Sequence, residues 1–397
     1  MNTATDHASL SSGACDAPSA ADLQALTDTV HRFARDEIAP HVTAWDEAGE
    51  FPRSLYQRAA ALGLLGLGYP EALGGTPAGW RMRNAMTIAL CRYGTSGGVL
   101  ASLYSHNIGL PPVLRYASPE VQQEVVPPVL RGEQIAALAI TEPGGGSDVA
   151  SLRTTARLDG DHYIVNGEKT FITSGVRADW ITLAVRTDRA NKGASGISML
   201  LVPGHLPGIT RTRLSKMGWL CSDTAQLHFD GVRVPARYLL GAEGTGFRTI
   251  MTNFNGERLA MSAAALGFAQ ACLDEALAWA RQRQTFGAPL LERQAIRHKL
   301  VDMQMRIAST RAWVDAVATL ADGGDQGPEW VAEVCMLKNH ATQAMQFCAD
   351  QAVQILGGMG FMRGTVAERI YREVKVMMIG GGAEEIMKGL AARQLGW

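Results

Sequence analysis

The chain has 397 residues, of which 47% are hydrophobic, so it can bury a large core, and its length predicts roughly two or three structural units. Its 37 basic and 38 acidic side chains give a formal net charge of -1, which argues against a nucleic-acid or anionic-membrane partner. The six cysteines lack the paired spacing of zinc sites and redox motifs, so we expect no metal site and free thiols in a reducing compartment.

In chain order, the sequence predicts helices, then strands, then helices. Residues 1–20 are small and polar and predict a frayed tail, with no signal peptide and no membrane span. Residues 21–136 show helical spacing of apolar side chains, and residues 137–242 contain short strand-like runs with a hairpin turn expected at Asn166-Gly167. Helical spacing returns over residues 243–397, where glycine pairs interrupt it. We expect a cytoplasmic protein that is mainly α with a β domain in the middle.

One stretch, residues 255–289, reads as a single long helix, because after the opening Asn255-Gly256 it has no proline and only one glycine, Gly267, before Gly287. This prediction places Glu257 at the start of an apolar face and Arg283 at the far end. At about 1.5 Å per residue the two side chains are roughly 39 Å apart, too far to serve the same end of one ligand. Arg283 is therefore expected to serve a different site, in this subunit or in another.

Taken singly, the short motifs have ordinary structural explanations. The glycine-rich residues 141–148 offer open amides that suit a phosphate or a polar ring, or they form a plain loop. Phe171 lies in an alternating strand and is more often a core residue than a stacking platform in that setting. Residues 354–360 are most simply a helix end and a turn. No glycine cluster fits the strand-turn-helix fingerprint of a nicotinamide site.

In combination, the motifs are specific, and the chain resembles the acyl-CoA dehydrogenase family of flavoproteins from about Asp22 to Trp397. The matching segments are Ala139-Ile140-Thr141-Glu142-Pro143, Gly146-Ser147-Asp148, Asn166-Gly167-Glu168-Lys169 continuing to Thr173, Lys216-Met217-Gly218, Arg283-Gln284-Thr285-Phe286-Gly287, and residues 354–360. The resemblance implies an N-terminal helical domain, a middle β-barrel-like domain and a C-terminal four-helix bundle. It also implies FAD, an acyl-CoA substrate, an electron-transfer flavoprotein as acceptor, and a homotetramer built as a dimer of dimers.

Residue by residue, the resemblance implies contacts with FAD from every part of the chain after the N-terminal helices. They are Leu138, Ile140, Thr141, Ser147, Phe171, Ile172, Thr173, Arg283, Thr285, Phe286, Gln294, Gln354, Ile355, Gly357, Gly358, Ala383 and Glu385. Of these, the segment around Arg283 and that around Gln354 would hold the FAD of a neighbouring subunit. Phe171 replaces a tryptophan found in many members, and stacking survives with less ring area. The implied substrate contacts are Ser147, Asn255, Arg258, Gly380 and Gly382.

The implied reaction is α,β-dehydrogenation of an acyl thioester, in which a carboxylate removes the α proton while the β hydrogen leaves as hydride to the flavin. The family polarises the thioester carbonyl with a flavin ribityl hydroxyl and one backbone amide, which here falls on Gly381. Many members carry their catalytic glutamate in this same loop, but Gly381 stands at that position.

A subset that includes isovaleryl-CoA and long-chain acyl-CoA dehydrogenases places the base in a Glu-Arg-Leu segment of the central helix. Glu257-Arg258-Leu259 matches this segment, and desolvation against an apolar helix face favours a basic carboxylate there. We therefore expect Glu257 to be the base, with Glu384 as the next candidate. The ordinary alternative for Glu257 is a surface residue near a helix start.

The two missing side chains at Gly380-Gly381 predict space for a branched or medium-to-long acyl group rather than butyryl, carried by CoA or by acyl-carrier protein. Two other functions remain open at this point. One is an oxidase or monooxygenase on the same scaffold, and the other is a non-catalytic flavin-binding subunit in an assembly.

Overall fold

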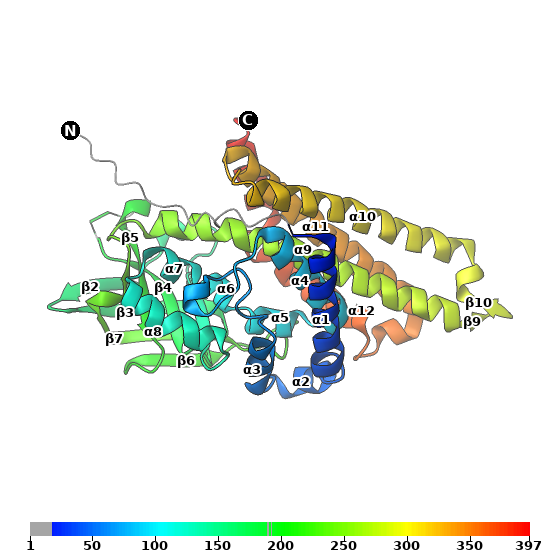
Figure 1. Ribbon diagram of the computed structural model, residues 1–397, viewed down its shortest axis with the longest axis horizontal. Helices are drawn as coiled ribbons and strands as arrows, with labels where there is room; N and C mark the ends of the chain where they lie inside the picture. Colours follow the sequence, from blue (N-terminus) through cyan, green and yellow to red (C-terminus); the bar gives the residue numbers. More distant parts are fainter. Residues whose placement is uncertain (1–17, 189, 192) are drawn as a thin grey trace.

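The computed structural model describes residues 18–188, 190–191 and 193–397. The predicted tail, residues 1–20, lies almost entirely outside this range. Its last residues already belong to the fold, because Ser19 caps helix α1 (Ala20–Phe33) through a reciprocal capping box with Asp22. Figure 1 shows the N-terminal helices between a sheet on one side and a long helical bundle on the other.

The N-terminal region is helical, as predicted, and it packs around its own core of residues such as Phe51, Leu55 and Leu103. Prolines begin helices α7 and α8, where the missing N–H is not needed. The elements are α1, a π-helical turn η1 (Ala34–Ile38), α2 (Val42–Ala48), α3 (Ser54–Ala61), η2 (Glu71–Leu73), α4 (Trp80–Gly94), α5 (Gly97–Leu103), α6 (His106–Gly109), α7 (Pro111–Tyr116) and α8 (Pro119–Leu130).

The middle region forms one eight-stranded sheet in the order β6-β7-β3-β2-β4-β5-β8, with β1 paired to β4 in parallel. Strands β4 and β5 are buried along their whole length, and Leu183 lies opposite Leu200 in their antiparallel register. Helices α7 and α8 share a core with this sheet. The strands are β1 (Ala136–Ala139), β2 (Thr155–Asp159), β3 (His162–Thr173), β4 (Trp180–Arg186), β5 (Ile197–Pro203), β6 (Ile209–Arg213), β7 (Thr224–Pro235) and β8 (Leu239–Leu240), with short turns η3 (Val149–Ser151), η4 (Ala194–Gly196) and η5 (Ala236–Tyr238).

The hairpin turn expected at Asn166-Gly167 is wrong. Strand β3 runs straight through this dipeptide, and the chain turns instead between β2 and β3, at Gly160 and its neighbour. Gly167 is needed for close packing, because a Cβ there would lie 2.7 Å from Cα of Thr154. Asn166 accepts a hydrogen bond from the Gly231 amide at 2.9 Å, beside an irregularity in the pairing of β3 with β7.

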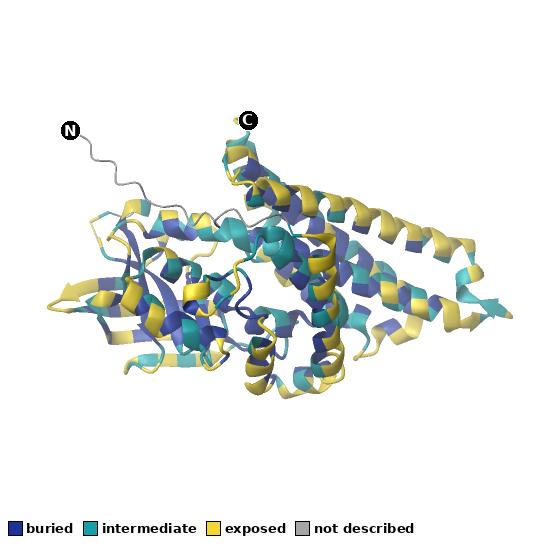
Figure 2. Ribbon diagram, in the orientation of Figure 1, coloured by how far each residue is buried: buried dark blue, intermediate teal, exposed yellow. Residues whose placement is uncertain are grey.

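The C-terminal region is a bundle in which α9 packs against α10, α11 and α12, and also against α4 of the N-terminal region. Figure 2 shows the buried faces of these helices turned inward and an exposed outer face on α10. The elements are α9 (Gly246–Gln282), β9 (Gln284–Thr285), β10 (Ala288–Pro289), η6 (Leu290–Glu292), α10 (Gln294–Asp322), α11 (Pro328–Leu356), η7 (Gly357–Phe361), α12 (Val366–Ile379) and α13 (Glu384–Gln394).

The bounds predicted for the long helix, residues 255–289, are wrong at both ends. Helix α9 begins at Gly246, which packs so closely on β5 that an added Cβ would lie 2.6 Å from the Ser198 backbone. It ends at Gln282 because the β9–β10 hairpin then turns the chain at Phe286, which has φ +51°. Glu257 therefore lies well inside the helix.

Among the helices of the described residues, none combines the length and the apolar character that a membrane crossing requires. The cysteines in this part of the chain, Cys91, Cys221, Cys272, Cys335 and Cys348, are buried and free.

Candidate active site

Glu257 is a partly buried carboxylate on α9. Its Oε2 atom is shielded from solvent and has no hydrogen-bond partner among the described residues. Burial raises the pKa of Glu257 to about 7, against the opposing effects of the cations Arg258 and Lys338. The alternative of a surface residue near a helix start is therefore wrong, and the side chain has the properties of a general base near neutral pH.

The glycine loop, residues 380–382, lies between α12 and α13 and is held against α9 and α11. Arg258, which is 4% exposed, donates from Nε to the Gly381 carbonyl at 2.9 Å and from Nη1 to Asn255 Oδ1 at 3.0 Å. The Lys338 ammonium donates to the Met378 and Gly382 carbonyls at 2.9 and 2.8 Å. The structure thus brings together the predicted base and most of the predicted substrate contacts.

Two backbone features distinguish this loop. Gly381 and Gly382 have φ values of +66° and +114°, which side-chain-bearing residues rarely adopt. The Gly381 amide has no acceptor in the part of the chain that the structure describes, so its N–H remains available to a ligand. Met261 fills part of the space beside the loop, because a Cβ on Gly381 would lie 3.0 Å from its sulfur.

Glu384, the next candidate base, is engaged elsewhere. It begins α13, and its Oε1 accepts hydrogen bonds from Lys388 Nζ at 2.6 Å and Gln343 Nε2 at 2.8 Å. These bonds lower the pKa of Glu384. A carboxylate held ionised by a surface ion pair is a weaker base than Glu257. The neighbouring predicted FAD contacts are Ala383, the N-cap of α13, and the exposed Glu385.

Phe171 projects away from the sheet. Its side chain is 69% exposed and its φ is +60°. The predicted in-and-out alternation is wrong here, because Lys169 and Thr170 are both buried and the pairing with β7 shifts register between Lys169 and Ile172. The ordinary alternative for Phe171 taken alone, a core residue, is therefore wrong, and its exposed ring suits a stacking partner.

A buried ion pair anchors the glycine-rich loop, residues 141–148. Lys169 Nζ donates to Glu142 Oε1 at 2.8 Å and to the Ile140 carbonyl at 2.9 Å, and the amides of Arg153 and Thr154 donate to the same carboxylate. Burial lowers the pKa of Lys169 to about 8. Burial also works against ionised Glu142, but Lys169 and the amide donors outweigh it and hold the pKa of Glu142 below its usual value. The loop lines a cavity of about 300 Å³.

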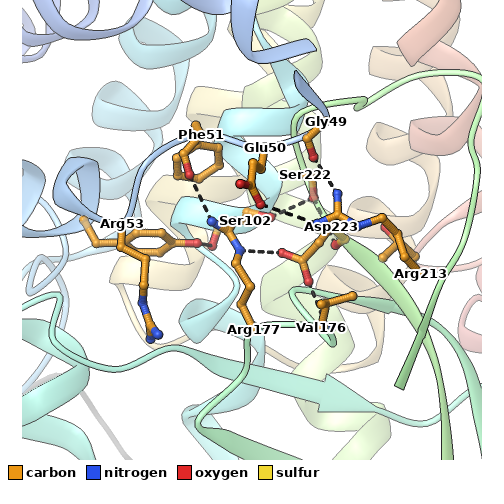
Figure 3. A network of polar contacts seen from close by, with 12 residues as sticks. Gly49, Glu50, Phe51, Arg53, Ser102, Val176, Arg177, Arg213, Ser222 and Asp223 are labelled. Carbon is orange, nitrogen blue, oxygen red and sulfur yellow. Dashed lines mark hydrogen bonds and ion pairs between the residues drawn. The ribbon is translucent and has the colours of Figure 1, made fainter. Parts of the chain in front are cut away.

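The turn that follows Thr173 is fixed by a polar network that reaches the N-terminal helices (Figure 3). Asp223 accepts hydrogen bonds from the Val176 amide and from Arg177 Nε, both at 2.8 Å. Arg177 in turn donates to the Phe51 carbonyl at 3.0 Å. The end of β3, which carries the predicted flavin contacts, is therefore tied to a neighbouring domain.

A second group of predicted FAD contacts lies at the far end of α9. Arg283 is exposed, Phe286 is 99% exposed, and the Thr285 hydroxyl is buried without a partner in the described chain. Figure 1 shows this β9–β10 hairpin at the tip of the bundle. A hydrogen bond of 2.6 Å from Lys299 to Gln351 places the start of α10, with Gln294, beside the end of α11.

The other predicted FAD contacts differ in what they can offer a ligand. Ile140, Ile172 and Ile355 have core side chains, so only their backbone atoms are available. The remaining positions are partly or fully exposed, and they are Leu138, Thr141, Ser147, Thr173, Gln354, Gly357 and Gly358.

Sequence reasoning missed Lys338. This lysine is fully buried on α11, on the same face as the buried residues Val334, Ala341 and Thr342. A single charged residue at helical spacing within an apolar face was the signal that could have found it.

Comparisons with known proteins agree with this architecture. Three family models match in order, the N-terminal, middle and C-terminal domains of acyl-CoA dehydrogenase, over residues 20–133, 137–232 and 244–396. A crystal structure described as an acyl-CoA dehydrogenase from Mycobacterium smegmatis has a TM-score of 0.92 and 46% identity, and the match covers 96% of this chain and 98% of that one.

Two mitochondrial enzymes of different substrate chain length are as similar to this chain as each other. The mouse long-chain specific acyl-CoA dehydrogenase is 36% identical over 93% of this chain and 85% of its own. The bovine short-chain specific enzyme is 36% identical over 94% of this chain and 89% of its own. These relatives confirm the resemblance and the fold. They do not distinguish a short from a long acyl chain in the substrate. The chain belongs to the acyl-CoA dehydrogenase family of oxidoreductases.

Proposed function

We propose that the protein is an FAD-dependent dehydrogenase that converts an acyl-CoA to its trans-2-enoyl-CoA, with Glu257 as the base. The observation that carries this proposal is the partly buried Glu257 carboxylate, whose shielded Oε2 has no partner among the described residues, beside a loop whose Gly381 N–H has no acceptor there. A base and a hydrogen-bond donor at one position are the two groups that proton removal next to a carbonyl requires.

The residues present fit FAD. The exposed Phe171 ring offers a stacking face, the loop at residues 141–148 offers open amides, and the buried Thr285 hydroxyl lacks a partner among the described residues. In one chain Arg283 and Thr285 lie at the far end of α9 from Glu257, which supports their serving the FAD of a neighbouring subunit in a homotetramer. Bound FAD supplies the acceptor for the β hydrogen, which leaves with its electron pair.

The protein's own groups then remove the α proton of the substrate. Gly381 N–H donates to the thioester carbonyl and stabilises the charge that develops on its oxygen when the α C–H bond breaks. Glu257 Oε2 receives the α proton, and a pKa of about 7 gives it enough basicity while it stays largely ionised above neutral pH. Arg258 fixes the loop through the Gly381 carbonyl.

The substrate is proposed to be a branched or medium-to-long acyl-CoA. Glycine at positions 380 and 381 leaves room beside the loop, and the flexible Met261 occupies part of it. A panel of straight and branched acyl-CoAs, tested by anaerobic bleaching of the flavin, measures this preference. The highest specificity constant for butyryl-CoA would contradict it. An electron-transfer flavoprotein as acceptor and a cytoplasmic location complete the proposal.

The base assignment is tested with Glu257→Gln and a matched control, Glu384→Gln. We expect Glu257→Gln to keep bound FAD and lose anaerobic flavin reduction, while Glu384→Gln keeps both. Full flavin reduction by Glu257→Gln would place the base elsewhere. Rapid reoxidation of the reduced wild-type protein in air would favour an oxidase, and no bleaching by any acyl-CoA would favour a non-catalytic subunit.

A further inference from the structure

We propose that Lys338 is a positioning residue that holds the glycine loop so that the Gly381 N–H points at the thioester carbonyl. This inference rests on the proposed function. It adds Lys338 to Arg258 as a second cation that holds the glycine loop. Lys338 comes from α11, a helix that contributes none of the predicted substrate contacts.

The hydrogen bonds of Lys338 bracket the loop. Its ammonium joins the carbonyl of Met378, in the last turn of α12, to that of Gly382, just before α13. Gly381 lies between these two carbonyls, and its own carbonyl is held by Arg258. Three carbonyls within five residues are thus fixed by two buried cations, and the intervening amide is left free for a ligand.

The unfavourable burial of the Lys338 charge indicates that this residue does more than end a helix. Burying an ammonium that is fully shielded from solvent is strongly unfavourable unless its hydrogen-bond acceptors are well placed. A glycine alone can end a helix without a buried charge, and this chain already has glycines there. A cation that also faces Glu257 can both fix the loop and favour the ionised form of the base.

The charged groups around this pair come from several helices. Arg258 on α9 and Lys338 on α11 face Glu257. Arg258, Glu257, Glu384 of α13 and the Cys335 thiol on its own helix face Lys338, whose pKa burial lowers to about 8. Removing the Lys338 charge therefore removes one of the two cations that oppose the effect of burial on Glu257.

The test uses the full-length holoprotein with Lys338→Met, which keeps the length of the side chain but has no charge and no donor. Lys338→Gln keeps a donor without the charge. The control is Lys375→Met, at an exposed lysine on α12 whose ammonium has the Met378 sulfur as its one hydrogen-bond partner among the described residues. Two quantities are measured: the carbonyl stretching frequency of a bound, isotopically labelled acyl-CoA, and the pH profile of anaerobic flavin reduction.

For Lys338→Met we expect a higher carbonyl frequency, because the bond is less polarised, and a rate of flavin reduction about 10- to 100-fold lower. The rising limb of the pH profile should move upward by at least about 0.5 pH unit. Lys338→Gln should show the same pH displacement with a smaller change in frequency. Lys375→Met should match the wild type.

A merely structural lysine would lower stability and leave both readouts unchanged in the folded variants, and that result would overturn the inference. If Lys338→Met does not fold, an unchanged pH profile in Lys338→Gln overturns it equally. Failure of the proposed function looks different, because the wild-type protein itself would then show no flavin reduction with any acyl-CoA.

Discussion

Replacing Glu257 by glutamine should stabilise the protein at alkaline pH, although it removes the proposed base. Burial raises the pKa of Glu257 from 4.5 to about 7. At about 1.4 kcal/mol per pKa unit, this difference corresponds to an unfavourable free energy of about 3 kcal/mol when the folded carboxylate is ionised. The side chain is partly exposed, so solvent screening reduces the expected effect to about 1–2 kcal/mol.

The sign follows from proton uptake. Because the folded pKa lies above the unfolded one, the folded state binds more protons between about pH 4.5 and 7, and stability falls as pH rises through this window. Glutamine has a similar shape and no charge. The variant should therefore match the wild type near pH 5 and exceed its free energy of unfolding at about pH 8.5 by about 1–2 kcal/mol.

Chemical denaturation at the two pH values measures this difference. Glu384→Gln is an informative control, because hydrogen bonds from Lys388 and Gln343 lower the pKa of Glu384 and its ionised form is stabilising. Its effect should have the opposite sign, with a loss of stability at the higher pH. A Glu257→Gln variant no more stable than the wild type at about pH 8.5 would refute the desolvation of this carboxylate.

The remaining predictions concern other sites. Lys169→Met should lower the free energy of unfolding by about 3–5 kcal/mol, because it leaves the Glu142 carboxylate buried without its cation; a loss below about 0.5 kcal/mol in urea denaturation would contradict this. Arg283→Ala should lose FAD and weaken the oligomer together by linkage, and size-exclusion chromatography with flavin absorbance would reveal the opposite case, a monomer with tightly bound FAD. Gly381→Glu should destabilise the protein by about 1–2 kcal/mol, and in a Glu257→Gln background we expect partial recovery of flavin reduction, with no recovery as the contrary result.

Local signals explain why much of the fold could be predicted from the sequence. Helices end where the glycines interrupt the apolar spacing, at Gly323, Gly357 and Gly380. Strands β4 and β5 are continuous apolar runs, which the sequence shows directly. These features depend on residues close together in the chain, and the order of helices, strands and helices follows from them.

The errors arise where distant residues decide the local structure. Asn166-Gly167 has the composition of a tight turn, but the contact of Gly167 with Thr154 makes it part of a long strand. Gly246 weakens helix propensity, yet the packing of α9 against β5 continues the helix to that residue. Periodicity alone does not contain either contact.

The candidate site shows the same division. The sequence indicates Glu257 because it forms a recognisable segment with its neighbours Arg258 and Leu259. The pairing of Lys169 with Glu142, and of Lys338 with the glycine loop, joins residues far apart in the chain, and no local pattern specifies such partners.

The backbone of the glycine loop gives a physical reason for a base on α9. A side chain at position 381 would adopt a left-handed φ of +66°, which costs roughly 1–2 kcal/mol, and its Cβ would lie 3.0 Å from the Met261 sulfur. The loop has little freedom to relax, because Arg258 and Lys338 hold its carbonyls. A carboxylate at Glu257 avoids this strain, since it stands on regular helical backbone and gains its basicity from burial. The conformation of the loop and the location of the base therefore support each other, and a loop glutamate would require both to change.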